Sequence, residues 1–442
     1  MRLIQTIKNI FKIEDLRARL VYTFLIIVLY RLGKYITLPG IDPSQLSALK
    51  NQTSSGLMGL LDMFSGGAFS QASVFALGIM PYISASIVVQ LLGIVFPYFQ
   101  KLQKEGESGR RKMNQYTRYL TIAVLVLQAP TYLVNLHAQL PESAFVLSGS
   151  FFTISSVIIL TAGTMFVMWL GERITDKGIG NGISLIIMIG IVARMPANFV
   201  FEAGTRMNGA GGAIALIVEL LIMFVVVLGT ILLVQGTRRV PVQYARRIVG
   251  NKQYGGVRQY IPLKVNAAGV MPIIFAQAIM MLPMIIAGYS NSGSGFVIAF
   301  SNMYGFWYNL VTGILIILFT YFYTAITINP VQMAEDMKKN GGFIPGIKPG
   351  RKTVEFIDTI MSRITLPGSI FLAIVAILPA FAVKAGITAQ FAQFYGGTTL
   401  LILVGVVLDT LQQIESHLLM RHYDGLMKSG RVKGRSGAVT SI

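Results

Sequence analysis

Apolar residues recur along the chain in long runs separated by polar stretches. Runs of about 20 apolar residues match helices that cross a hydrocarbon core about 30 Å thick. The pattern therefore predicts an all-α polytopic membrane protein with ten transmembrane helices. Arg194 and Pro196 interrupt the fifth run, which is the least regular. The predicted spans are residues 20–37, 75–97, 119–136, 153–171, 183–204, 213–234, 267–288, 307–328, 366–383 and 398–414.

The positive charges fall almost entirely on alternate connections between these runs. The N-terminus, every second loop and the C-terminus together hold 31 of the 37 Lys and Arg residues. Because short basic loops stay in the cytoplasm, both termini are predicted to be cytoplasmic and the protein to be a multi-pass inner-membrane protein. The first 19 residues are too charged and too long to begin a cleaved signal peptide.

Composition supports this class of protein. The chain is 54% apolar and 12% charged, about half the charge that a soluble domain carries. It contains no cysteine, which excludes a disulfide framework, a thiolate metal site and a cysteine nucleophile.

The net charge of +19 gathers in three predicted cytoplasmic elements, residues 98–118, 235–265 and 329–365. Basic residues near span ends follow from topology and contact anionic lipid headgroups. Those spread through the long loop 235–265 also suit a large acidic partner such as RNA, whose phosphates attract Lys and Arg. Charge alone leaves both interpretations open.

Five sequence motifs identify a family. They read VFALGIMPYISASIVVQLL at 74–92, QKEGESGRRKMNQYTRY at 103–119, DKGIGNGISLII at 176–187, PLKVNAAGVMPIIF at 262–275 and FIPGIKPG at 343–350. Together they resemble the SecY family, the channel subunits of the bacterial Sec protein translocase. The resemblance extends to the tail ESHLLMRHYDGLMKSG at 415–430 and covers nearly the whole chain.

The resemblance implies a channel that moves unfolded preproteins across the bacterial cytoplasmic membrane and releases transmembrane segments sideways into lipid. It implies two pseudo-symmetric inverted halves of five spans around a central pore, residues 1–206 and 207–442. A glycine-rich stretch within residues 202–212 suits a flexible joint between the halves, although it also fits an ordinary external loop.

The resemblance assigns a ring of isoleucines to the pore. Ile79 and Ile83 are four residues apart and share a helix face, and Ile183 and Ile187 repeat this spacing. A branched aliphatic ring gates by excluding water. Without the resemblance, each isoleucine fits a lipid-facing or helix-packing position better. The implied ring is Ile79, Ile83, Ile183, Ile187, Ile274 and Ile402.

Residues 57–73 are apolar but broken at Gly66 and Gly67, so they are too short to span the membrane. They resemble the family's plug, a small helix in the closed pore. The alternative is an interfacial helix in the headgroups. The implied plug residues are Leu60, Leu61, Asp62, Met63, Phe64, Ser65, Gly66 and Gly67.

The resemblance also implies a lateral gate, with spans 2 and 3 facing spans 7 and 8. Polar residues within these apolar runs are candidates for closing it, and ordinary helix packing by hydrogen bonds is the alternative. By the resemblance, Leu282 faces Ser84 across the closed gate. The implied gate residues are Ser84, Gln90, Gln128, Gln277 and Leu282.

The loops 235–265 and 329–365 are expected to dock the SecA ATPase and the ribosome, through rRNA and proteins. Lys252 and Lys348 stand where relatives commonly carry Arg. Lysine lacks the planar guanidinium group that binds one phosphate through two hydrogen bonds. Other implied partners are SecE-like and SecG-like small membrane subunits, signal sequences and membrane lipids. The docking candidates are Arg246, Arg247, Lys252, Arg258, Lys348 and Arg351.

The sequence predicts no enzyme, cofactor or metal site. It contains no GxxxxGK[ST] loop, GIGNG at 178–182 follows no strand, and His417 and His422 fall on different helix faces. The competing hypothesis is an ion-coupled secondary transporter of small solutes, which needs a polar site at mid-membrane. Glu219 and Asp409 are the acids within the spans, and Asp409 is expected to be structural.

Overall fold

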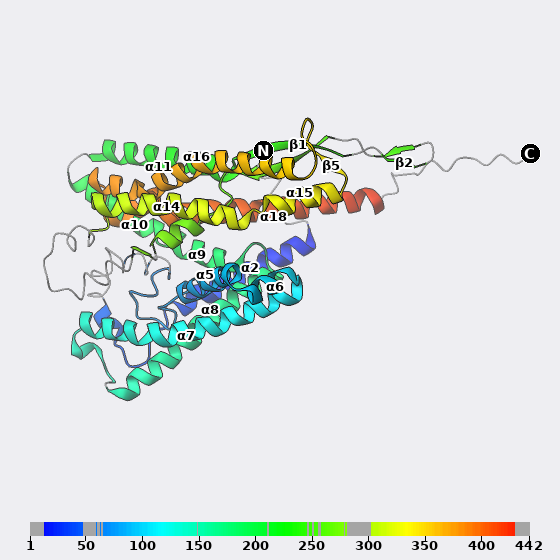
Figure 1. The fold of residues 1–442 in the computed structure, drawn as a ribbon. Helices are drawn as coiled ribbons and strands as arrows, with labels where there is room; N and C mark the ends of the chain where they lie inside the picture. The colour runs from blue at the N-terminus through cyan, green and yellow to red at the C-terminus, as the bar shows by residue number, and fades with distance from the viewer. Residues whose placement is uncertain are drawn as a thin grey trace, which may run out of the picture.

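Long helices run side by side through most of the molecule (Figure 1). The computed structural model describes residues 13–46, 59, 62, 65–147, 149–209, 212–244, 247–249, 252–254, 258–277, 279–280 and 302–428. Within these ranges, seven helices are long and apolar enough to cross a membrane, or up to eight if one bent pair is a single span. The helical membrane fold is thereby confirmed.

The first half contributes five of the predicted spans. Its bent pair is α5 with α6, whose axes differ by 102° at a break over residues 94–96. The break follows from Pro97, because the residue before a proline avoids the helical region and Phe96 is extended. The helices are α2 (Glu14–Gly33), α5 (Met80–Val95), α6 (Pro97–Lys104), α7 (Glu107–Gln139), α8 (Ser150–Lys177), α9 (Gly182–Val192) and α10 (Met195–Asn208).

The second half forms a separate group of helices, drawn above the first in Figure 1. Residues 271–277 begin the seventh span, and most of its later part lies outside the described residues. Short helices α17 (Ala389–Ala392) and η3 (Gln393–Tyr395) connect the last two spans. The long helices are α11 (Gly212–Gln235), α14 (Phe306–Thr327), α16 (Arg351–Lys384) and α18 (Gly397–Lys428), and α15 (Pro330–Lys339) follows α14.

The two long basic loops form one subdomain, which the sequence did not predict. β1 (Thr237–Tyr244) pairs in antiparallel fashion with β4 (Arg258–Lys264) and with β5 (Gly342–Phe343). β2 (Arg247–Val249) and β3 (Lys252–Tyr254) form a separate two-stranded pair. Side chains from both loops share a small apolar core, composed of Val240, Val242, Leu263, Met337, Ile344, Ile357 and Met361.

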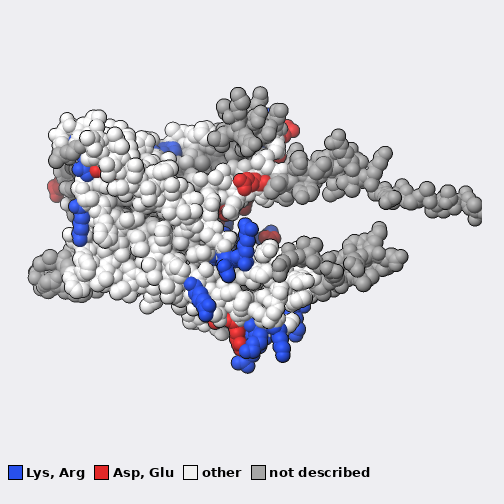
Figure 2. Space-filling view, turned by 90° about the horizontal axis from the view of Figure 1, so that it is seen from above, with Lys and Arg blue, Asp and Glu red and all other residues white. Residues whose placement is uncertain are grey.

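Charged side chains are concentrated toward the ends of the molecule. Figure 2 shows a broad middle band with few Lys, Arg, Asp or Glu residues and a dense group of basic residues at one end. Large apolar side chains are exposed along this band, and on α11 they include Ile214, Leu221, Phe224 and Leu232. Exposed apolar helix faces of this extent are stable in lipid and not in water.

Candidate functional site

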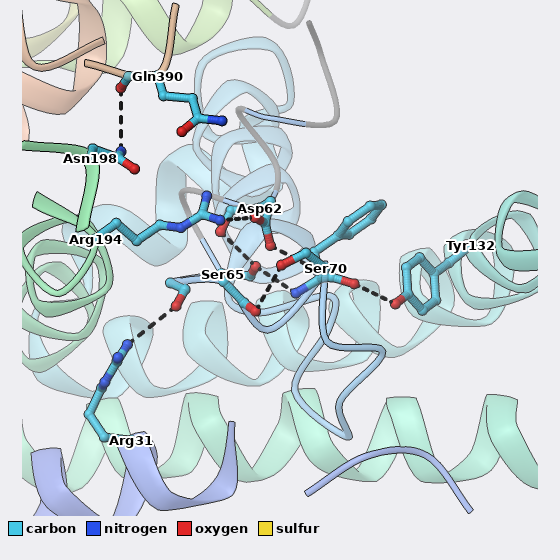
Figure 3. A network of polar contacts seen from close by, with 11 residues as sticks. Arg31, Asp62, Ser65, Ser70, Tyr132, Arg194, Asn198 and Gln390 are labelled. Atoms are coloured by element: carbon cyan, nitrogen blue, oxygen red, sulfur yellow. Dashed lines mark hydrogen bonds and ion pairs between the residues drawn. The ribbon is translucent and has the colours of Figure 1, made fainter. Parts of the chain in front are cut away.

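Asp62 is the centre of a buried polar network before α5 (Figure 3). Its carboxylate forms an ion pair with Arg194. Its other side-chain oxygen accepts a hydrogen bond from the backbone N–H of Ser70 at 2.8 Å. The backbone carbonyl of Asp62 accepts hydrogen bonds from Gly67 N at 2.7 Å and from Ser65 Oγ at 3.1 Å. A single buried acid thus organises the described residues 65–70 of the predicted plug.

Two helices of the first half also hold this segment. Tyr132 on α7 donates its hydroxyl to the carbonyl of Phe69 at 2.9 Å. Arg31 on α2 donates to the carbonyl of Gly66 at 3.3 Å (Figure 3). Together with Arg194 between α9 and α10, these contacts attach the segment to three separate helical elements of one half.

Gly66 permits a close approach to α9. Its φ is +66°, and a Cβ at this position would lie 2.8 Å from the Cα of Gly190. A side chain at position 66 would therefore strain the backbone and collide with the helix. The interruption at Gly66 and Gly67, from which the sequence predicted a broken segment, is therefore a point at which the segment packs closely against α9.

The structure describes four of the eight predicted plug residues, namely Asp62, Ser65, Gly66 and Gly67. All four are buried, and Asp62 is helical whereas residues 65–67 form turns. Leu60, Leu61, Met63 and Phe64 lie outside the described residues.

Five of the six predicted pore isoleucines pack in two adjoining clusters. Ile187 and Ile402 belong to one cluster and Ile79 to the other, and the partly buried Ile83 and Ile183 contact both. Ala68 of the predicted plug belongs to the same cluster as Ile79. Ile274 is half-buried near the start of the seventh span, where its neighbour Ile273 joins the core of the second half.

A hydrogen bond joins span 2 to span 8 at the predicted gate. Tyr323 on α14 donates its hydroxyl to Gln90 Oε1 on α5 at 3.2 Å. The amide nitrogen of Gln90 donates in turn to Ser86 Oγ at 3.3 Å. The Phe275 ring lies beside Tyr323, with ring centroids 6.4 Å apart. Sequence reasoning identified Gln90 and missed Tyr323, whose polar tip gives no periodic signal.

The other gate candidates differ in position. Ser84 is exposed and donates to the carbonyl of Met80 in its own helix at 3.1 Å. Gln128 on α7 is also exposed, Gln277 is half-buried, and Leu282 lies outside the described residues. Of the gate candidates that the structure describes, Gln90 is the one that forms a hydrogen bond between the two halves.

The described docking candidates lie on or beside the basic subdomain. Lys348 is exposed, and the Arg351 side chain is 94% exposed although its Nε lies 3.5 Å from Glu355. An ion pair this exposed contributes little and leaves the guanidinium accessible. Arg247, Lys252 and Arg258 lie on β2, β3 and β4, respectively. Arg246 lies outside the described residues.

The GIGNG stretch uses one backbone amide to bond the second half and another to bond α2 of its own half. Gly180 N donates to Gln413 Oε1 on α18 at 2.9 Å, and Ile179 N donates to Thr23 Oγ1 at 3.2 Å. Asn181 caps α9 by accepting from Ser184 N. The motif thus binds protein side chains where a dinucleotide fold would bind phosphate. Asp409 accepts from Gln413 at 3.5 Å and so supports this junction.

Sequence reasoning missed one set of functional candidates on α10. Arg194, Asn198, Glu202 and Arg206 are spaced by four residues, so they lie on one helix face. Glu202 is fully buried and Arg206 is bonded to it. The signal was present in the sequence, because four polar residues at this spacing in an apolar run are unusual.

The comparisons with known proteins agree on one family. The SecY family model matches residues 73–411. The chain is 45% identical over 438 residues to the protein translocase subunit SecY of Corynebacterium glutamicum, covering 95% of this chain and 98% of that protein. It is 45% identical over 442 residues to the Mycobacterium tuberculosis subunit, covering 94% of this chain and 97% of that protein.

Solved structures share the fold. One is described as "The structure of a protein conducting channel", with a TM-score of 0.61, 18% identity and coverage of 90% of this chain and 92% of that chain. Another is Sec61 in the canine ribosome-channel complex, with a TM-score of 0.57, 18% identity and the same coverage.

Proposed function

The chain belongs to the SecY family of protein translocase subunits and forms a protein-conducting channel, and we propose that this channel opens both across the membrane and sideways. Unfolded preproteins pass through a plugged pore, and transmembrane segments leave between α5 and the helices of the second half. The ion-coupled transporter is not favoured, because the matched relatives are translocase subunits.

The buried Asp62 is the observation that carries the proposal. Its pairing with Arg194 and its backbone hydrogen bonds hold residues 65–70 beside the isoleucine clusters. In this arrangement the aliphatic side chains exclude water and the plug segment covers them on the external side. A hydrophobic constriction closes by dewetting and still parts around an extended peptide.

We propose that a single weak hydrogen bond restrains the lateral opening. The Tyr323–Gln90 hydrogen bond joins the halves on the gate side. Polar contacts between membrane helices contribute about 0.6–2 kcal/mol each. A hydrogen bond of this strength is easily broken when an apolar signal helix packs against α5.

The basic subdomain is proposed to dock a SecA-type ATPase and the ribosome. Lys348, Arg351, Arg238 and Arg239 are all exposed on it, and a related channel was solved in a ribosome-channel complex. SecE-like and SecG-like subunits are the proposed membrane partners. The bacterial inner membrane with cytoplasmic termini is the proposed location, since 31 of 37 basic residues lie on one side.

Reconstitution tests the proposal directly. Vesicles that contain this chain, a SecE-like subunit and a SecA-type ATPase should import a signal-bearing preprotein into a protease-protected state when ATP is present. The same preprotein without its signal is the matched control. Protection without ATP, or equal protection of both substrates, would contradict the proposal, and gradient-driven uptake of a small solute would support a transporter instead.

A further inference from the structure

Four polar residues from Arg194 to Arg206 form a polar stripe along one face of α10. The two ends of this stripe contact different parts of the channel. Arg194 occupies the N-cap position of the helix and pairs with Asp62 of the plug. Asn198, Glu202 and Arg206 follow at four-residue intervals on the same face. All three of these contact residues of the second half, although α10 itself belongs to the first half.

The first contacts join α10 to the connection between α16 and α18. Asn198 Nδ2 donates to the carbonyl of Gln390 at 3.4 Å (Figure 3). Glu202 Oε2 accepts from Thr388 N at 3.1 Å and also from the Thr388 hydroxyl. Because Glu202 is fully buried, these two bonds replace the water that its carboxylate would otherwise need.

Arg206 extends the network to α11. Its guanidinium lies 3.2 Å from Glu202 and 2.5 Å from Glu219. Tyr395 donates its hydroxyl to the carbonyl of Glu219 at 2.8 Å. Two buried acids thus share one arginine, and loss of that arginine would leave both without a counter-charge. Breaking a buried network in this way is strongly destabilising.

α9 and α10 together form one membrane-length helix, Gly182–Asn208, with a local break inside it. α9 ends at Val192, α10 starts at Met195, and Arg194 occupies the N-cap position between them. A short helix held firmly by the second half follows that half when it moves. The Asp62–Arg194 ion pair is the contact across which such a displacement would act, because the segment that follows Asp62 is bonded to α7 through Phe69 and to α2 through Gly66.

We infer that α10 is a coupling helix, which holds the plug through Arg194 and follows the second half through Asn198, Glu202 and Arg206. This inference rests on the proposed plugged channel. Movement of the second half would draw Arg194 away from Asp62 and release the plug. The reverse also holds, because an intact plug stabilises the closed arrangement of the halves by the same coupling free energy.

A single introduced thiol tests this coupling in the resting channel. The chain has no cysteine, so Ser70→Cys adds the only thiol, at a plug position that is 3% exposed. Labelling by a membrane-impermeant maleimide then measures plug release without any transport. Arg206→Met should raise the labelling rate about fivefold or more, which is the usual range of coupling between sites. Thr205→Val, an exposed neighbour off the stripe, should leave the rate unchanged.

Two further variants separate the outcomes. Arg194→Met breaks the plug contact itself and should raise Ser70→Cys labelling. If it does not, the proposed plug is wrong. If it does and Arg206→Met leaves labelling at the parent rate, the plug stands and the coupling is wrong. Should Arg206→Met fail to assemble, Asn198→Ala removes one contact more gently and should raise labelling in the same direction, and an unchanged rate there overturns the coupling.

Discussion

Asp62 and Arg194 form an ion pair between the segment before α5 and the break between α9 and α10. The Asp62 side chain has no exposed surface, whereas 25% of the Arg194 side chain is exposed. The acid therefore depends on Arg194 for its counter-charge, while the arginine can reach solvent. The break in span 5, which made that span the least regular in the sequence, places the arginine at this position.

Replacing Arg194 should destabilise the closed position of the plug. Arg194→Met leaves the Asp62 charge buried and unpaired, which costs about 3–5 kcal/mol. We expect frequent openings of the resting channel in single-channel recordings. The double variant Asp62→Asn with Arg194→Met should leak less than Arg194→Met alone, because the asparagine still accepts from Ser70 N without a charge. Lys384→Met, at the exposed end of α16, is the control. Equal leak in the single and double variants would argue against the ion pair as the anchor.

Polar substitutions in the isoleucine clusters should open the seal itself. Ile187→Asn and Ile402→Asn place an amide among buried aliphatic side chains and lower the cost of wetting the constriction. We expect a steady rise in resting ion conductance and weaker dependence on a good signal sequence. Ile222→Asn, on an exposed face of α11, is the matched control. Conductance equal to that of the parent would show that these residues do not form the ring.

The helical spans could be predicted from the sequence because hydrophobicity reports burial in lipid. It does not report where a helix ends. α7 begins at Glu107 and α16 at Arg351, many polar residues before their predicted spans. α5 begins at Met80 with Pro81 in its first turn, which suits a helix start, and residues 75–79 of the predicted span form turns.

The site was harder to predict because it depends on contacts between distant segments. The resemblance identified Gln90, but nothing in the sequence pointed to Tyr323 as its partner. The strand β1 contains Pro241 and two arginines, which disfavour a strand prediction. It forms because Val240 and Val242 alternate into a core that the other basic loop completes.

Reversing charge on the basic subdomain should weaken docking of both proposed partners. Lys348→Glu with Arg351→Glu replaces two exposed cations that have no role in the apolar core. Affinity for a SecA-type ATPase and for ribosomes should fall, and the difference from the parent should shrink at high salt because screening weakens the parent's attraction. Lys384→Glu, on the other side of the membrane, serves as control. Binding that is unchanged at low salt would place the docking surface elsewhere.

Loss of the Tyr323 hydroxyl should favour the open gate. Tyr323→Phe leaves Gln90 Oε1 without this donor while keeping the ring beside Phe275. A contact of 0.6–2 kcal/mol corresponds to about a 3- to 30-fold shift in the gate equilibrium. Preproteins with weakened signals should therefore be exported faster, as measured by protease protection in vesicles. Tyr321→Phe on the same helix is the control. An unchanged export rate for preproteins with weakened signals would show that this bond does not hold the gate closed.

A disulfide across the predicted gate tests whether spans 2 and 7 have to separate during transport. Ser84→Cys with Leu282→Cys would introduce the only thiols in the chain, and a disulfide needs Cα atoms within about 7 Å. Oxidation should block export and membrane insertion, and a reducing agent should restore both. Asn198→Cys with Gln390→Cys locks two elements that we infer move together, so oxidation there should leave transport intact. If the gate pair crosslinks fully and export continues at the full rate, spans 2 and 7 do not separate. If the Asn198–Gln390 disulfide blocks export, the second half has to move away from α10, and the inference that they move together is wrong.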